Sequence, residues 1–253
     1  MDDETLFRLL VDLHRDGARQ GPGSEAETRR ALDLTRLDKA AALQVADIGC
    51  GTGAATLVLA QALPHAAIAA VDLSSVFLET LMQRAEAAGC TAQIAPHEMS
   101  MDALAFAPES LDLIWAEGAI YNIGFRAGLH AWRPFLRPGG VVAVSEITWL
   151  RPDPPAEVRD YWMDAYPEIA TASEKIAILE AAGYDLRGYF VLSPSSWLQG
   201  YYTPLKERLP AFQTRHDNAP EAGAVAAMER KEAALYMRYQ DWFSYGFYVA
   251  RAR

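Results

Sequence analysis

Short, mostly apolar runs alternate along the chain with longer segments in which apolar residues recur every three or four positions. Such short runs are typical of strands buried on both faces, and the longer periodic segments are typical of helices. Strands are predicted at residues 43–49, 67–73, 91–96, 111–118 and 141–150. Helices are predicted at residues 54–63, 76–89 and 126–136. Strands and helices in this order form a parallel sheet covered on both faces.

Two further helices are predicted before this region. The first covers residues 3–16, where leucines recur at helical spacing. The second begins at Ser24, because Ser24 and Glu27 have the S-x-x-E spacing of a capping box. Its apolar positions follow at intervals of three residues, at Ala31, Leu34 and Leu37.

The last third of the chain departs from the alternation. Residues 185–193 and 242–253 are typical of strands, but a long and mostly helical segment separates them. We expect these two strands to pair antiparallel at one edge of the sheet. Residues 151–170 are rich in proline and aromatic side chains, and we expect them to form a lid over the strand ends.

Together these elements predict an α/β fold. It is a Rossmann-like, doubly wound and mostly parallel seven-stranded sheet with an antiparallel edge strand, N-terminal helices and a helical insertion before the last strand. We expect residues 1–253 to form a single domain. Within it, residues 1–40 form an N-terminal helical cap, residues 41–150 the cofactor-binding core, and residues 151–253 the lid, the inserted helices and the edge strands.

Composition narrows the functional classes. The 253 residues are 51% hydrophobic, enough to bury one sizeable core. A net charge of −10 and an isoelectric point of about 5.0 disfavour polyanionic partners, so we expect neither nucleic acid nor an anionic membrane surface. The acidic residues 1–17 resemble neither a signal peptide nor an anchor. Cys50 and Cys90 match no metal-ligand spacing and no disulfide scaffold, which indicates the reducing cytoplasm.

The strongest candidate for chemistry is the glycine-rich segment "DIGCGTG" at residues 47–53. It follows the first core strand, and parallel sheets bind ligands beyond the carboxyl ends of their strands. A phosphate-binding P-loop is excluded because no Lys-Ser or Lys-Thr pair follows the glycines. A dinucleotide site fits the spacing, since Gly49, Gly51 and Ala54 match G-x-G-x-x-G/A and Asp72 lies where a ribose-binding acid is expected.

Asp47 favours a different cofactor. An acid two residues before the first glycine places negative charge where a pyrophosphate would lie, but it suits an ammonium group. S-adenosylmethionine carries an α-ammonium and a sulfonium but no phosphate, and its carboxylate suits a helix N-terminus. A short-chain reductase would also need Tyr-x-x-x-Lys, whereas Tyr121 is followed by Phe125. An NAD(P)-dependent oxidoreductase is therefore the alternative.

Several motifs together resemble class I S-adenosylmethionine-dependent methyltransferases over residues 43–150. They are "VADIGCGTG", "AAVDLS", "SMDALAF", "LDLIWAEGAIYN" and "FLRPGGVVAVSE". Three flanking segments, "RQGPGSEAETRRAL", "EGAIYNIGF" and "YWMDAYPEI", further resemble a bacterial group of small-molecule methyltransferases related to the ubiquinone and menaquinone biosynthesis type. The resemblance implies S-adenosylmethionine as cofactor and S-adenosylhomocysteine as product.

The resemblance also implies a set of cofactor-binding residues. Asp47, Gly49 and Gly51 would surround the methionine moiety, with Cys50 filling the turn. Asp72 would accept hydrogen bonds from both ribose hydroxyls, next to Leu73. Ser100 and Met101 stand where relatives contact the adenine, although many relatives have an acid at the position of Ser100. The segment from Gln20 to Ser24, with Gly21 and Ser24, would close over the cofactor.

Candidate catalytic residues are Glu117, Tyr121 and His14. Glu117 follows a buried strand at the ligand-binding edge, where we expect it to contact cofactor or substrate. Tyr121 and Asn122 follow one turn later and can orient an acceptor; the alternative is packing and capping. His14 precedes the cofactor loop and is a candidate base; the alternative is a residue on the helix surface.

Candidate acceptor-binding residues follow the next strand and lie in the lid. Glu146 ends its strand in the same way as Glu117, and Trp162, Asp164 and Tyr166 belong to the lid segment. Core packing is the favoured alternative for Trp162. If Glu117, Glu146 and Asp164 converge, the site prefers a neutral or cationic acceptor over a carboxylate.

The predicted activity is methyl transfer to a small-molecule acceptor by in-line displacement. The alternatives are a non-catalytic module that binds S-adenosylmethionine, and an enzyme that methylates nucleic acid. The Asn-Pro-Pro-Tyr-like run of exocyclic-amine methyltransferases is replaced here by "AEGAIYN". No metal site is predicted, because no two histidines lie at ligand spacing. A homodimer is the candidate assembly.

Overall fold

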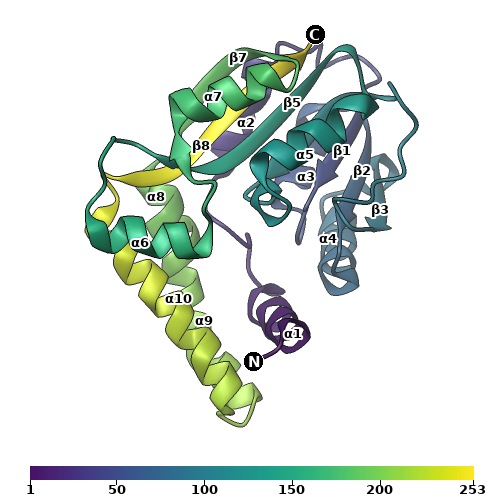
Figure 1. The fold of residues 1–253 in the computed structure, drawn as a ribbon. Helices are drawn as coiled ribbons and strands as arrows, with labels where there is room; N and C mark the ends of the chain where they lie inside the picture. The colour runs from purple at the N-terminus through teal and green to yellow at the C-terminus, as the bar shows by residue number, and fades with distance from the viewer.

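A single twisted sheet forms the centre of the computed structural model, which describes residues 1–253 (Figure 1). Its order is β3-β2-β1-β4-β5-β8-β7, and the short strand β6 pairs with β5 outside this path. The predicted doubly wound sheet of seven strands is confirmed, with β6 as an addition. The strands are β1 (Gln44–Ile48), β2 (Ala67–Asp72), β3 (Ile94–Glu98), β4 (Leu111–Glu117), β5 (Leu136–Trp149), β6 (Ala170–Thr171), β7 (Tyr184–Val191) and β8 (Phe243–Ala252).

Helices cover both faces of the sheet and extend beyond it (Figure 1). They are α1 (Asp3–His14), α2 (Glu25–Thr35), α3 (Ala54–Ala62), α4 (Ser75–Ala87), α5 (Phe125–Trp132), α6 (Ala156–Ala165), α7 (Ala172–Ala181), α8 (Pro194–Trp197), α9 (Thr203–Arg215) and α10 (Pro220–Tyr239).

The central strands β1 and β4 are mostly apolar because each is buried on both faces. In β1, Val45 packs into the hydrophobic cluster formed with α2, α3 and α4, whereas its neighbours Ala46 and Ile48 pack into the cluster formed with α5 and α7. In β4, Trp115 and Ile114 divide between the same two clusters. This alternation is the two-residue period of a strand, and it explains why continuous apolar runs predicted the strands.

The sheet order reverses next to β1. From β1 the chain moves outward through β2 to β3, then returns to place β4 on the other side of β1, and all these pairs are parallel. The helices that follow β1 and β4 therefore leave on opposite faces, which opens a crevice at the carboxyl ends of these two strands. The glycine-rich segment lies at that point.

The two C-terminal strands pair antiparallel at one edge, as predicted. β8 runs opposite to both β5 and β7 and lies between them, so β7 is the outermost strand. The antiparallel pairing of β5 with β8 extends from Val141 with Arg251 to Trp149 with Phe243.

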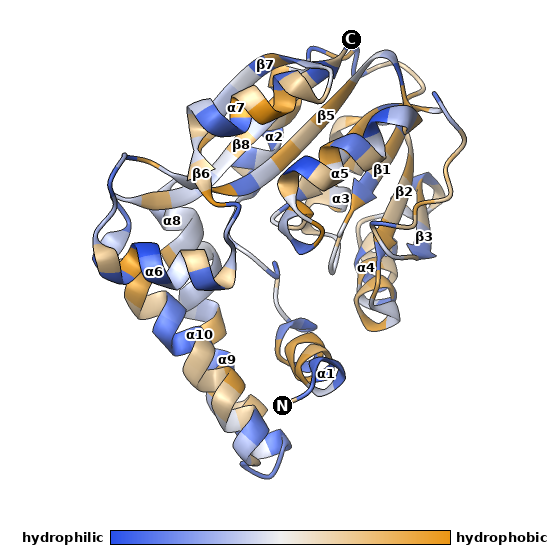
Figure 2. Cartoon of the chain, in the orientation of Figure 1, coloured by the Kyte–Doolittle hydropathy of each residue, from blue (hydrophilic) through white to orange (hydrophobic).

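A third hydrophobic cluster lies outside the sheet layers. It joins α1, α6, α8, α9 and α10, which we call the cap, to the ends of β5 and β8. Helix α1 contacts both α9 and α10, although almost two hundred residues of chain separate them. In Figure 2, α1 and α10 each carry hydrophobic and hydrophilic turns, as expected of helices with one buried side. No helix of the structure has the length and apolarity that a membrane crossing requires.

Some boundaries differ from the predicted ones. Helix α2 ends at Thr35 because Arg36 adopts a left-handed conformation, so Leu37 lies outside the helix. Strand β5 already begins at Leu136, and the predicted turn at residues 137–140 is instead an irregularity within its pairing to β4. The lid segment contains α6, which joins the hydrophobic cluster of the cap through Val158 and Trp162.

Candidate active site

The glycine-rich loop connects β1 to α3 and requires glycine at two positions. Gly49 has φ +72° and Gly51 has φ +54°, a region that favours glycine. A Cβ atom on Gly49 would collide with the side chain of Ala119, and one on Gly51 would collide with the side-chain amide of Gln20. The loop therefore presents bare backbone at the crevice, beside the N-terminus of α3. Such a surface suits the close approach of a ligand carboxylate.

Asp72 lies at the carboxyl end of β2 and is held in one position. Its Oδ2 accepts a hydrogen bond from the Gly51 amide (2.8 Å), and its Oδ1 accepts one from the Ser74 amide (2.9 Å). Burial raises the pKa of this carboxyl. Leu73 follows it with a side chain that is 56% exposed, so this end of the crevice is open to solvent. A fixed carboxylate beside an open edge fits the pair of ribose hydroxyls.

Asp47 is buried beneath the loop. Its only hydrogen-bond donor is the Thr56 hydroxyl, at 2.6 Å from Oδ2. Burial raises the pKa of Asp47 to about 7, with Glu117 and Asp72 adding to the rise. A buried carboxylate without a paired cation is stabilised by a positively charged ligand group. Cys50 fills the turn next to it and is buried.

Cofactor affinity should therefore depend on pH. Asp47 is ionised only above a pH of about 7, and the ionised form attracts an α-ammonium. We expect the affinity for S-adenosylhomocysteine to fall by up to about tenfold per pH unit below pH 7. Calorimetric titrations between about pH 5.5 and 7.5 measure this. Asp47→Asn should flatten the profile near pH 7, and an equally steep profile in that variant would assign the effect to another group.

The segment from Gly17 to Ser24, which we call the strap, crosses the glycine-rich loop. The Thr52 amide donates to Gln20 Oε1 (3.0 Å), and Gln20 Nε2 donates to the Thr52 hydroxyl (2.9 Å). Arg84 on α4 donates to the carbonyl of Gly17 (3.0 Å). At the far end, Ser24 caps α2 by accepting from the Glu27 amide, which confirms the predicted helix start. Between them Gly21 has no neighbouring atoms close to its Cβ position.

Glu117 fastens the strap to the end of β4. Arg19 Nη1 lies 2.6 Å from Glu117 Oε2, while the Thr28 hydroxyl and the Trp115 indole N–H both donate to Oε1, at 2.7 and 3.0 Å. The side chains of Arg19 and Glu117 are 13% and 11% exposed. A carboxylate that already accepts from three donors is poorly suited to act as a base, so its position favours a holding role.

Removing the ion pair between Arg19 and Glu117 should weaken the attachment of the strap to the end of β4. Charge-assisted hydrogen bonds of this kind contribute about 1.5–3 kcal/mol. We expect Arg19→Ala to speed the dissociation of S-adenosylhomocysteine by about tenfold or more, and to expose the strap to proteolysis. Stopped-flow displacement and limited proteolysis measure the two effects. Arg29→Ala, which removes an exposed pair with Glu25, is the control. An unchanged dissociation rate in Arg19→Ala would show that the strap does not retain the cofactor.

The residues predicted at the adenine end lie near the loop. Met101 is half-buried, and its Cε lies 3.4 Å from the Cβ position of Gly49. Its carbonyl accepts a hydrogen bond from the indole N–H of Trp132 (2.9 Å), which fixes the backbone. Ser100 donates to Asp102 (2.5 Å). Met101 is thus placed to pack on a flat ligand, whereas Ser100 is engaged with its neighbour.

Convergence of three acids was the condition for the predicted acceptor preference, and it is not met. Glu117 is bound as described, and Glu146 is fully buried with one oxygen 3.1 Å from Lys175 Nζ. Asp164 is exposed on α6. The premise of the predicted acceptor preference is therefore wrong for these residues, because two of the acids have cationic partners and the third faces solvent.

The remaining predicted residues divide between packing and exposure. Trp162 packs edge-on against Phe243 in the cap, so the core-packing alternative holds for it. The Tyr166 hydroxyl accepts from the Phe125 amide (3.3 Å). Asn122 caps the turn by donating to the Ala119 carbonyl (2.9 Å). Tyr121 is 40% exposed, with its ring edge-on to that of Tyr166.

His14 is not a surface residue, and that alternative is wrong. It is 6% exposed, because α1 turns this side toward α10. Its Nε2 lies 3.5 Å from Glu229, its ring stacks on Tyr201, and its Nδ1 has no partner.

Sequence reasoning singled out Tyr121 but missed the other side chains of a group near His14. We call Tyr121, Tyr201, Tyr245, Glu229 and Glu232 the tyrosine–glutamate cluster. Tyr245 comes from β8, Tyr201 from the π-helical turn Leu198–Tyr202, and both glutamates from α10. The only available signal was the three-residue spacing of Glu229 and Glu232, which places both on one side of the helix, with Arg230 and Lys231 between them.

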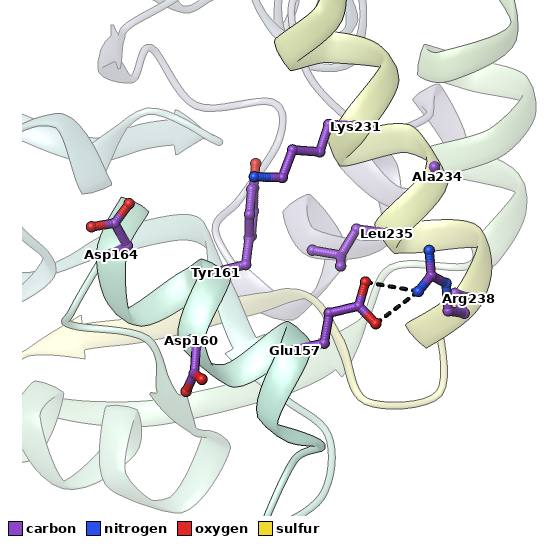
Figure 3. Close-up of a pocket in the computed structure, with 8 residues that line it drawn as sticks. All are labelled: Glu157, Asp160, Tyr161, Asp164, Lys231, Ala234, Leu235 and Arg238. Carbon is purple, nitrogen blue, oxygen red and sulfur yellow. Dashed lines mark hydrogen bonds and ion pairs between the residues drawn. The ribbon is translucent and has the colours of Figure 1, made fainter.

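A surface pocket of about 450 Å³ lies elsewhere, between α6 and α10 (Figure 3). Glu157 and Arg238 form an ion pair across it, and Asp164 points away from Lys231 at its rim (Figure 3). None of its lining residues belongs to the glycine-rich loop or to the strand ends.

Comparison with known proteins finds methyltransferases. A family model described as a methyltransferase domain matches residues 45–140. Trans-aconitate 2-methyltransferase from Paracidovorax citrulli (strain AAC00-1) is 29% identical over 84% of this chain and 86% of its own length.

Two solved structures of S-adenosylmethionine-dependent methyltransferases in complex with S-adenosylhomocysteine share the fold. The protein from Geobacter sulfurreducens has a TM-score of 0.83 at 17% identity, covering 97% of this chain and 98% of its own. The protein from Thiobacillus denitrificans has a TM-score of 0.82 at 21% identity and covers all of both chains.

Proposed function

Because the chain is a class I S-adenosylmethionine-dependent methyltransferase that acts on a small molecule, we propose that the acceptor binds where the cap meets the carboxyl ends of β4 and β5. The observation that carries this proposal is the position of Tyr245. Its ring and hydroxyl lie 3.6 Å from the Cβ position of Gly118, directly after Glu117. The tyrosine–glutamate cluster thus reaches the strand end that borders the glycine-rich loop.

The proposed cofactor contacts follow from the geometry of the loop. Asp72 accepts from the ribose hydroxyls, with Leu73 beside it. Asp47 attracts the α-ammonium, while Gly49, Cys50 and Gly51 present backbone to the methionine carboxylate. Ser100 and Met101 border the adenine. Residues of the strap, among them Gly21 and Ser24, would cover the cofactor.

The chemistry asks little of the protein beyond alignment. S-adenosylmethionine supplies a methyl carbon that its sulfonium already activates. The side chains of the cap must hold the acceptor atom in line with that carbon and exclude water. Tyr121 and Tyr245 are placed to orient the acceptor, and His14 with Glu229 is placed to receive a proton. We propose that residues 1–40 and 151–253 supply this acceptor half of a single domain.

A carboxylate acceptor is the second candidate. The relative from Paracidovorax citrulli is named for trans-aconitate, and Arg208 on α9 has a buried Nε without a hydrogen-bond partner.

A methyl-transfer assay tests the proposal. We expect the protein to bind S-adenosylhomocysteine but not NADPH in calorimetric titrations, and to transfer a tritiated methyl group onto at least one member of a panel of amines, phenols and carboxylic acids. Tyr245→Ala should reduce transfer while leaving S-adenosylhomocysteine binding intact. Equal transfer by Tyr245→Ala would place the acceptor elsewhere, and cofactor binding without transfer to any acceptor would favour the non-catalytic module.

A further inference from the structure

The tyrosine–glutamate cluster holds more negative than positive charge. Glu232 accepts hydrogen bonds from the hydroxyls of Tyr202 (2.9 Å) and Tyr161 (3.2 Å), but no cation pairs with it. Glu229 is 8% exposed and faces only the imidazole of His14. Neither acid therefore forms an ion pair with a lysine or arginine, and Arg208 on α9 is the basic side chain that lies nearest to Glu229 in charge interaction.

The neighbouring acid shows the contrast. Glu146 is also buried, but Lys175 lies 3.1 Å away and balances its charge. The chain thus supplies a cation to the buried acid beneath the site and none to the two acids of α10. A cationic ligand would supply the positive charge that is missing at this site, which adjoins the methyl-transfer position.

Electrostatics in the cluster agree with this imbalance. Burial together with the charge of Glu229 raises the pKa of Glu232 to about 7. Burial, reinforced by Glu229 and Glu232, also raises the pKa of the Tyr201 hydroxyl. A bound cation would favour the ionised form of Glu232.

An unpaired polar atom lies beside the cluster. His14 is 6% exposed, and its buried Nδ1 has no hydrogen-bond partner. Buried polar groups in native proteins are nearly always hydrogen-bonded, so this atom indicates a ligand that is bound during function.

The aromatic walls of the cluster are fixed. The Tyr245 ring stacks on Trp197 with centroids 5.2 Å apart, and the Tyr121 ring meets Tyr166 edge-on at 6.1 Å. Rigid aromatic faces beside carboxylates are a favourable environment for an ammonium group.

We propose that the tyrosine–glutamate cluster binds a protonated amine, so that the methyl acceptor is an amine. This inference rests on the proposed function. The ammonium first gives a proton to Glu232 or to the His14–Glu229 pair. The freed nitrogen lone pair then forms the N–C bond to the methyl group as the C–S bond breaks, and the electrons of that bond pass to sulfur. The products are the methylated amine and S-adenosylhomocysteine.

Arg208 is the nearest competitor for an anionic acceptor. One of its terminal nitrogens lies 3.0 Å from the Cβ position of Gly17, so the guanidinium reaches the strap. A carboxylate acceptor would bind there rather than between the two glutamates.

Binding of two matched probes distinguishes these sites. The protein is first saturated with S-adenosylhomocysteine and then titrated with benzyltrimethylammonium, which cannot be methylated, or with 3-phenylpropionate. We expect the ammonium to bind more tightly. Glu232→Gln should weaken the binding of benzyltrimethylammonium by about tenfold or more. Glu157→Gln removes an exposed acid of α6 and should not affect binding.

Tyr121→Ala is a second test, because Tyr121 is exposed and its loss should leave the fold intact. This variant should also weaken the binding of benzyltrimethylammonium. The proposal is overturned if 3-phenylpropionate binds more tightly than benzyltrimethylammonium and its affinity falls in Arg208→Gln. It is also overturned if neither Glu232→Gln nor Tyr121→Ala weakens the binding of benzyltrimethylammonium. Failure of S-adenosylhomocysteine to bind in the first step would instead contradict the proposed function.

Discussion

Replacing Asp72 by alanine is expected to abolish measurable binding of S-adenosylmethionine and S-adenosylhomocysteine. The carboxylate would lose two charge-assisted hydrogen bonds to the ribose, each contributing about 1.5–3 kcal/mol, which together correspond to roughly a hundredfold or greater loss of affinity. The variant also removes the acceptor for the Gly51 and Ser74 amides, so the loop that faces the methionine moiety loses its support. Both effects act in the same direction.

Isothermal titration calorimetry with S-adenosylhomocysteine measures this loss. Glu79→Ala is the matched control, because Glu79 is an exposed acid on the nearby helix α4. This variant should bind S-adenosylhomocysteine as the parent protein does. Binding retained within about threefold in Asp72→Ala would mean that the ribose lies elsewhere. Binding of NADPH to the parent protein would return the loop to the dinucleotide interpretation.

Lys175→Met is expected to produce the largest loss of stability. The ammonium of Lys175 is wholly buried, 3.1 Å from Glu146 and 4.6 Å from the centre of the Phe125 ring. Removing it leaves the buried carboxylate of Glu146 uncompensated, and breaking a buried pair in this way typically costs about 3–5 kcal/mol. The double variant Lys175→Met with Glu146→Leu removes both charges and should recover most of that free energy.

Urea denaturation of the three proteins gives the free energies of unfolding. Lys39→Met is the control, since Lys39 pairs with Asp33 on the surface and such pairs contribute about 1 kcal/mol or less. A loss of less than about 1 kcal/mol in Lys175→Met, or a double variant no more stable than the single one, would show that Glu146 does not depend on Lys175 for its charge.

The fold could be predicted because its central strands are buried on both faces. Continuous apolar runs such as residues 111–118 have few alternatives once helices flank them, and the glycines of the loop follow from backbone geometry alone. The ends of strands were harder to predict where glycine and proline interrupt the apolar pattern, as at residues 137–140. There the chain stays within β5, with a register shift in its pairing to β4 and a positive φ at Gly139.

The acids of the site were predicted less well, for a physical reason. Glu117 ends β4 as predicted, but Glu146 lies within β5 rather than at its end, and sequence alone does not show which cation reaches each. Arg19 comes from the strap, far earlier in the chain, and Lys175 from α7. Glu229 and Glu232 were missed because their role depends on α1 and α10 packing together, a contact between the two ends of the described chain.

The position of β8 in the sheet has a consequence for biosynthesis. Strand β5 is complete at Trp149, but its antiparallel neighbour begins only at Phe243, and until then β5 and β7 each keep an unpaired edge. Unpaired edges of apolar strands are sites of aggregation during folding. While the intervening helices are being translated, the nascent chain depends on the ribosome or on chaperones to shield these edges. Premature termination anywhere before residue 243 would release a polypeptide prone to aggregate or to be degraded.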